Sequence, residues 1–128
     1  MSRFFPALVA LTLAAWPASA ETYTLFIYET PSDIALRTDA GPEGTAYWAA
    51  YSEFGALLGR DGVVRGGAPL IPRDRAGTGE LILGGYFQIE TASHAAAEAY
   101  AAEAPSSKRG GKTLVLEHLP TPGMLPLQ

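Results

Sequence analysis

The stretch that decides the fold is Leu83-Gly84-Gly85-Tyr86-Phe87-Gln88-Ile89-Glu90, together with the residues on its C-terminal side. Its apolar and polar side chains alternate in the way that is typical of a half-buried strand. An alanine-rich segment comes next, and it predicts a helix that Thr91 or Ser93 can cap and that packs close to a sheet. Pro105 ends this helix, and Lys112-Thr113-Leu114-Val115-Leu116 begins another strand. The second half of the chain is therefore predicted to be strand, helix and strand.

The first half predicts the same order. Thr22 to Tyr28 alternates as a strand, and the proline- and glycine-bearing residues 31–44 are expected to form a loop after it. Apolar side chains then recur at steps of three and four from about Thr45 to Leu58, which indicates one buried face of a helix. Asp61-Gly62 turns the chain into a short strand at Val63 to Arg65, and the third strand is expected from Glu80 to Glu90.

With a fourth strand at Lys112 to Leu119, the order becomes β-α-β-β-α-β. This order predicts an α+β fold of the ferredoxin-like kind, an antiparallel sheet with two helices on one face. The other face is expected to carry Phe26, Tyr28, Ile82, Tyr86 and Val115. Such a face is too apolar to stay in water, so we expect a homodimer whose two sheet faces pack and enclose a cavity. A shift of register by one residue would exchange the two faces.

Residues 1–20 are expected to be a signal peptide rather than part of the fold. Arg3 supplies a positive start, Phe4 to Trp16 is mostly apolar, and Ala18-Ser19-Ala20 is a suitable cleavage site. The apolar run is shorter than the roughly 18–20 residues that a bilayer requires. We therefore expect an exported protein, periplasmic or secreted, with no stable membrane anchor after cleavage.

Cleavage would leave 108 of the 128 residues, enough for one domain. We assign that domain to residues 21–119 and an extended tail to residues 120–128. Arg3 is the only charged residue removed, so 8 basic and 13 acidic residues remain, a net charge of −5. An acidic surface argues against a nucleic-acid partner, which requires a basic one. The chain has no cysteine, so no disulfide stabilises the fold.

Several stretches resemble the YCII-related family, small proteins that form dimeric α+β barrels. They are Tyr23 to Tyr28, Tyr47 to Tyr51, Gly62 to Leu70 and Gly84 to Pro105. The resemblance implies a ferredoxin-like subunit and a site for a small organic molecule. Some members pair a His in the first helix with an Asp after the second strand; this chain has no His near Ala49 to Tyr51, and Asp74 stands roughly at the Asp position. The Asp-Gly-Pro-Phe signature of a large branch is also absent, since Ala76-Gly77-Thr78-Gly79 precedes the third strand.

The candidate catalytic residues are Asp74 and His118. Arg73 and Arg75 flank Asp74 and would keep its carboxylate ionised on a long loop, although a solvated charged turn has the same composition. His118 ends the fourth strand, where an imidazole next to a carboxylate could move protons near neutral pH. The alternative is an ordinary half-exposed histidine at a strand end, because the spacing of residues in the sequence does not indicate which carboxylate would be its partner.

The candidate substrate-binding residues are Tyr28, Arg65 and Tyr86. The two phenols lie on strands and could meet an aromatic or acidic ligand in the enclosed cavity. Arg65 could bind a carboxylate with two hydrogen bonds, but edge strands also carry charges to prevent unwanted pairing. The sequence contains no nucleophile elbow, phosphate-binding glycine loop or metal signature, so no cofactor and no metal are expected.

Three functions fit these observations. The first is a cofactor-independent enzyme, a lyase or isomerase, that acts on a small organic molecule, as the family resemblance implies. The second is a non-catalytic module of the cell envelope that holds a small apolar ligand between two subunits. The third is a structural dimer without a pocket.

Overall fold

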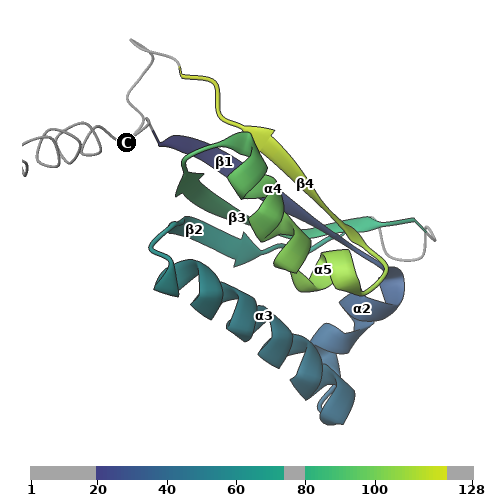
Figure 1. The fold of residues 1–128 in the computed structure, drawn as a ribbon. Coiled ribbons are helices and arrows are strands. Elements are labelled where there is room, and N and C mark those ends of the chain that lie inside the picture. Colours follow the sequence, from purple (N-terminus) through teal and green to yellow (C-terminus); the bar gives the residue numbers. More distant parts are fainter. Residues whose placement is uncertain (1–19, 74–79, 121–128) are drawn as a thin grey trace, which may run out of the picture.

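The fold is α+β, with one four-stranded sheet and several helices (Figure 1). The computed structural model describes residues 20–73 and 80–120, so the proposed signal peptide and nearly all of the tail lie outside the described residues. The strands are β1 (Glu21–Glu29), β2 (Val64–Pro69), β3 (Ile82–Thr91) and β4 (Lys112–Glu117). They pair antiparallel in the order β2-β3-β1-β4, which is compatible with a ferredoxin-like subunit.

The helices are α2 (Pro31–Ala35), the 3₁₀ turn η1 (Leu36–Thr38), α3 (Pro42–Arg60), α4 (His94–Glu103) and α5 (Pro105–Lys108). The prediction of a loop across residues 31–44 was wrong. Thr30 caps α2 by accepting a hydrogen bond from the Asp33 amide at 3.1 Å, and Pro31 and Pro42 occupy first turns, where a missing amide proton costs nothing. Proline in this segment starts helices instead of excluding them.

The helix predicted after the third strand is confirmed as α4, and a second short helix, α5, follows it directly. Ser93 caps α4 and accepts a hydrogen bond from the Ala96 amide at 3.1 Å. Pro105 ends α4, as expected, and then begins α5, which the sequence did not predict. The second strand is also longer than expected and continues through Gly66 to Pro69. Gly67 explains the extension, because a Cβ there would lie 2.7 Å from the Tyr86 carbonyl oxygen of β3.

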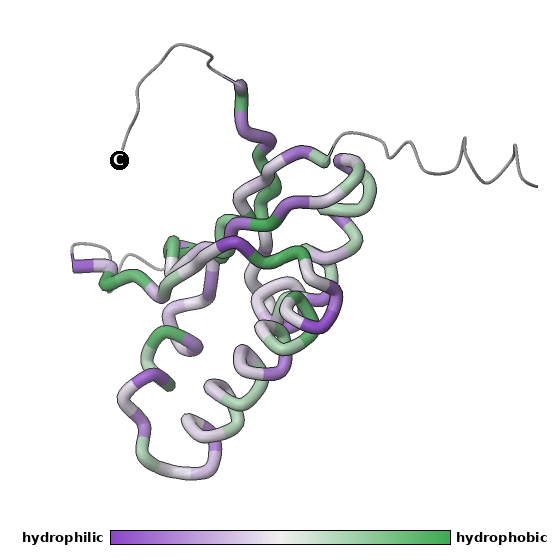
Figure 2. The backbone as a smooth tube through the Cα atoms, turned by 90° about the vertical axis from the view of Figure 1, so that its left-hand side faces the viewer, coloured by the Kyte–Doolittle hydropathy of each residue, from purple (hydrophilic) through white to green (hydrophobic). Residues whose placement is uncertain are grey.

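The helices pack on one face of the sheet and form a single core with it. The core combines Tyr23, Leu25, Ile27, Ile89 and Val115 from the strands with Phe54, Leu58, Ala97, Ala101 and Ala104 from the helical segments. The small alanine side chains bring α4 close to β1 and β4, whereas α3 contributes aromatic rings and leucines. Figure 2 shows that many of the most hydrophobic residues lie in the strands.

A bulge in β3 changes which strand residues share the opposite face. Ile27 pairs with Gly85 but Tyr28 pairs with Leu83, so Gly84 is an extra residue in β3. The bulge reverses the alternation, which puts Leu83 on the face away from the helices and leaves Ile82 only 2% exposed on the helix side. The expected place of Ile82 on the open face was therefore wrong.

Val115 was also assigned to the wrong face. It pairs with Leu25 of the core and is buried, while its neighbours Leu114 and Leu116 are 40% and 50% exposed. We call the uncovered side of the sheet the open face. By strand register its apolar members are Phe26, Tyr28, Leu83, Tyr86, Leu114 and Leu116.

Candidate functional site

The candidate site is built around Glu29, the last residue of β1, whose side chain is 2% exposed. Side chains alternate along a strand, so Glu29 lies on the same side as Tyr23, Leu25 and Ile27 and carries a charge toward the helices. Burying an unpaired carboxylate costs several kcal/mol. The fold must therefore bring donors to it.

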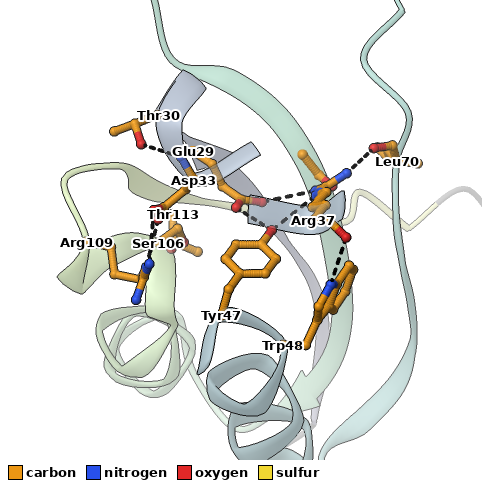
Figure 3. Close-up of polar contacts among 11 residues, drawn as sticks. Glu29, Thr30, Asp33, Arg37, Tyr47, Trp48, Leu70, Ser106, Arg109 and Thr113 are labelled. Carbon is orange, nitrogen blue, oxygen red and sulfur yellow. Dashed lines mark hydrogen bonds and ion pairs between the residues drawn. The ribbon is translucent and has the colours of Figure 1, made fainter. Parts of the chain in front are cut away.

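Two side chains supply those donors (Figure 3). The Tyr47 hydroxyl, from α3, donates to Glu29 Oε1 at 2.6 Å. The Arg37 guanidinium, from η1, donates through Nη2 to Glu29 Oε2 at 3.1 Å. Each carboxylate oxygen thus has a partner, and the network joins β1 to two helical segments.

The remaining donors of Arg37 are bound as well. Its Nε donates to the Tyr47 hydroxyl at 3.1 Å and its Nη1 donates to the Leu70 carbonyl at 2.7 Å. Its Nη2 also donates to the Gly84 carbonyl. The indole of Trp48 closes the network by donating to the Arg37 carbonyl at 3.2 Å. A guanidinium has five N–H donors, so few of them remain for a ligand.

The glycine at the β3 bulge makes this network possible. A Cβ on Gly84 would overlap Glu29 Oε2 and would lie 2.7 Å from Arg37 Nη2. The stretch that predicts the strand therefore also provides the space for the buried ion pair.

The electrostatics of the cluster keep Tyr47 neutral. Burial, followed by its hydrogen bond to Glu29, raises the pKa of Tyr47 well above its ordinary value. Burial opposes the charge on Arg37, but the Tyr47 bond and the Glu29 charge outweigh it and raise the pKa of the guanidinium. Tyr47 consequently acts as a hydrogen-bond donor and not as a phenolate base.

A small pocket lies beside the cluster, with a volume of about 70 Å³. Its lining consists of Ile27, Glu29, Arg37, Tyr47, Trp48, Tyr51, Ala68, Pro69, Gly84, Gly85, Tyr86 and Phe87. The polar groups of Glu29, Arg37 and Tyr47 are already hydrogen-bonded to one another. The pocket therefore offers a mainly apolar and aromatic wall, and it is smaller than the roughly 300–1,000 Å³ of ordinary ligand sites.

A second network lies next to the first and ties α2 to the segment after α5. Arg109 binds both carboxylate oxygens of Asp33, at 2.8 and 3.1 Å, and its guanidinium carbon lies 5.9 Å from the centre of the Tyr47 ring. The Tyr51 hydroxyl is buried here and has no hydrogen-bond partner among the described residues. Burial raises the pKa of Tyr51, which keeps this phenol neutral too.

Three of the residues predicted from the sequence lie on the open face. Tyr28 has the Lys112 ammonium 5.5 Å from its ring centre, and Tyr86 pairs with Phe26 of β1. His118 lies beyond β4, where its Nε2 is 2.6 Å from Thr24 Oγ1 and its amide donates to the Thr22 carbonyl. None of the three has a hydrogen bond to a carboxylate in the described part of the chain.

Arg65 is the fourth predicted residue that the structure describes, and its partner Glu90 lies opposite Thr22 on the open face. Arg65 is exposed at an irregularity of β2, and its Nε donates to Glu90 at 2.9 Å while its Nη1 donates to the Gly62 and Val64 carbonyls. Asp74 lies outside the described residues. Among the described residues, no hydrogen bond or ion pair links Tyr28, Arg65, Tyr86 and His118 to one another.

Sequence analysis missed Glu29 and Arg37 and assigned Tyr47 to the core alone. A signal was present: Glu29 continues the alternation of Tyr23, Leu25 and Ile27, so a carboxylate at that position requires a buried partner. The partner itself could not be named, because Arg37 comes from a turn that the sequence predicted as loop.

No family model, curated protein or solved structure matches the chain. Across residues 20–73 and 80–120, His, Asp and Glu side chains form no group of three that could hold a metal ion. In the same residues, no helix combines the length and the hydrophobicity needed to cross a bilayer.

Proposed function

We propose that the chain is an exported, non-catalytic protein that binds a small apolar ligand as a homodimer. The open face is the observation that carries the proposal. Six apolar side chains lie on it, and no described helix covers them. Two of these, Leu114 and Leu116, are 40% and 50% exposed. A contiguous apolar surface of this kind is typical of an interaction site.

A dimer through the open face would also give the ligand enough room. The pocket of about 70 Å³ beside Glu29 is too small for an organic ligand by itself. Two opposed faces would enclose a chamber into which Tyr28 and Tyr86 could project from each subunit. The resemblance to the YCII-related family, whose members form dimeric α+β barrels, supports the same arrangement.

The Glu29 cluster favours binding over catalysis. A general base needs a free lone pair directed at the substrate, and a general acid needs a transferable proton. Glu29 instead accepts from Tyr47 and Arg37, and those donors are directed at each other and at main-chain carbonyls. Such a network holds β1, η1 and α3 in place and leaves its polar groups bound to one another.

The proposal is tested by sedimentation at micromolar concentration. We expect the wild-type chain to sediment as a dimer and the double variant with Leu114→Asp and Leu116→Asp to sediment as a folded monomer. Ala99→Asp, on the exposed side of α4, is the matched control and should leave the dimer unchanged. A wild-type protein that stays monomeric and fully folded would refute the proposal.

The ligand is tested separately by thermal shift with a panel of small aromatic compounds. Binding to the folded state raises the midpoint by an amount that grows with the logarithm of the ligand concentration relative to Kd. We expect stabilisation of the wild type by at least one member, and a smaller effect in the monomeric double variant. A flat response across the panel would leave a structural dimer without a ligand.

A cofactor-independent lyase or isomerase is the second candidate, and one observation favours it. Glu29 lies on the pocket wall, and its 2.6 Å bond from Tyr47 is short, as bonds to a carboxylate are. Turnover of any ligand that the panel identifies should then be lost in Glu29→Gln. Unchanged turnover in that variant would remove Glu29 from the chemistry.

A further inference from the structure

We propose that the groove between α3 and the α4–α5 segment binds a small organic acid with an apolar body. This groove lies apart from both the open face and the pocket beside Glu29. Its α3 wall is formed by Ala50, Glu53, Phe54, Leu57 and Arg60. These residues recur at helical steps of three and four, so they form one stripe of roughly 15 Å along the helix.

The opposite wall comes from Glu103, Pro105, Lys108 and Arg109. Pro105 turns the chain from α4 into α5, and α5 packs near α3 (Figure 1). The groove has a volume of about 620 Å³, within the usual range for small-molecule sites. The half-buried Ala50 and Leu57 give it apolar surface for the body of a ligand, and the buried Phe54 and Pro105 lie at its base.

The charges on the rim select the class of ligand. Lys108 is paired with Glu103 at 3.0 Å, and Arg109 is held by both oxygens of Asp33. Arg60 has no hydrogen bond or ion pair within the described part of the chain, so its whole guanidinium can meet a carboxylate. Among the described residues, it is the one cation on this rim without an acidic partner.

The ion pairs with Glu103 and Asp33 neutralise Lys108 and Arg109, so the carboxylate-binding position on the rim is Arg60. Glu53 lies two turns before Arg60 on the same stripe and would repel a second negative group. This arrangement fits a monoacid, with its carboxylate at Arg60 and its apolar body against Leu57 and Ala50.

Calorimetric titration with octanoate tests the assignment, and octanol is the uncharged control. We expect one saturable site per chain for octanoate and at least tenfold weaker binding of octanol. Arg60→Gln should weaken octanoate binding by about tenfold or more, because a charge-assisted bond contributes about 1.5–3 kcal/mol. Arg73→Gln, an exposed arginine outside the groove, should leave the affinity unchanged.

Ala50→Trp provides an independent test because it fills the groove, and Ala49→Trp on the neighbouring exposed position is its control. We expect only the first to abolish binding. Equal affinities for octanoate and octanol, or full binding by the Ala50 variant, would overturn the proposal. Loss of dimer mass in Arg60→Gln would assign the groove to a second copy and would overturn it as well. The open-face variants do not touch this groove, so failure of the dimer proposal leaves the titration interpretable.

Discussion

Gly84→Ala tests whether the β3 bulge exists to accommodate the buried ion pair. The new methyl group would overlap Glu29 Oε2 and would lie 2.7 Å from Arg37 Nη2, so one of the groups must move. Gly84 is not among the described glycines with a positive φ, so the backbone itself accepts alanine. The cost therefore arises from the displaced carboxylate and guanidinium.

The magnitude depends on the bonds at stake. Displacing Glu29 weakens its bonds from Tyr47 and Arg37, and hydrogen bonds to charged groups contribute about 1.5–3 kcal/mol each. Partial relaxation of the side chains preserves some of this energy. We expect the free energy of unfolding to fall by about 2–4 kcal/mol, which lowers the thermal midpoint by roughly 10–20 °C in a domain of this size.

Urea unfolding followed by circular dichroism measures the effect. Gly55→Ala is the matched control, since a Cβ there meets nothing within 4 Å and alanine should stabilise α3 by about 0.5–1 kcal/mol. In a Glu29→Ala background the added cost of Gly84→Ala should shrink, because the colliding carboxylate is gone. A Gly84→Ala variant within about 0.5 kcal/mol of wild type would refute the reasoning.

The remaining predictions concern alkaline pH, the second ion pair and the strand-end histidine. Burial raises the pKa of Tyr23 from 10.0 to about 12, and it also raises the pKa of Tyr47. The stability that these neutral phenols contribute is complete below pH 10 and should be lost as the pH rises toward 12. A thermal midpoint that stays constant up to pH 12 would contradict this prediction. Arg109→Ala should lower the free energy of unfolding by about 1 kcal/mol, a modest amount because the ion pair of Arg109 with Asp33 is partly exposed. If urea titrations at high salt show the same loss, the contribution of this pair is not ionic. His118→Ala should change the free energy of unfolding by less than about 0.5 kcal/mol, since this side chain is exposed and contacts Thr24 at the sheet end; a larger loss in the same assay would show a structural role.

Strand and helix patterns predicted most of the fold because they are local properties. The alternation of Thr22 to Tyr28 and the helical spacing of Tyr47, Phe54 and Leu58 each report on one buried face. One error arose where a single residue changes the pattern. Gly84 adds one position to β3 and reverses the faces of Ile82 and Leu83, and no local signal distinguishes a bulge glycine from an ordinary strand glycine.

The candidate site was less predictable than the fold. Glu29 was visible as a charge on the core side of a strand, but its donors come from η1 and α3, eight and eighteen residues away. The predicted residues Tyr28, Tyr86 and His118 do share one face, but no hydrogen bond joins them, and Arg65 is bound to Glu90. Spacing in the chain identifies faces; it does not identify which side chains meet across them.

By itself, the sequence predicted the four strands, the two longest helices and a second apolar sheet face, because side-chain periodicity expresses burial directly. Only the tertiary structure decided that Glu29, Arg37 and Tyr47 bind one another, and that α3 and α5 leave a groove with Arg60 on its rim. These features depend on how distant segments approach in space. Gly84 of β3, for example, leaves the space that Glu29 of β1 and Arg37 of η1 occupy, and no single stretch of sequence contains all three.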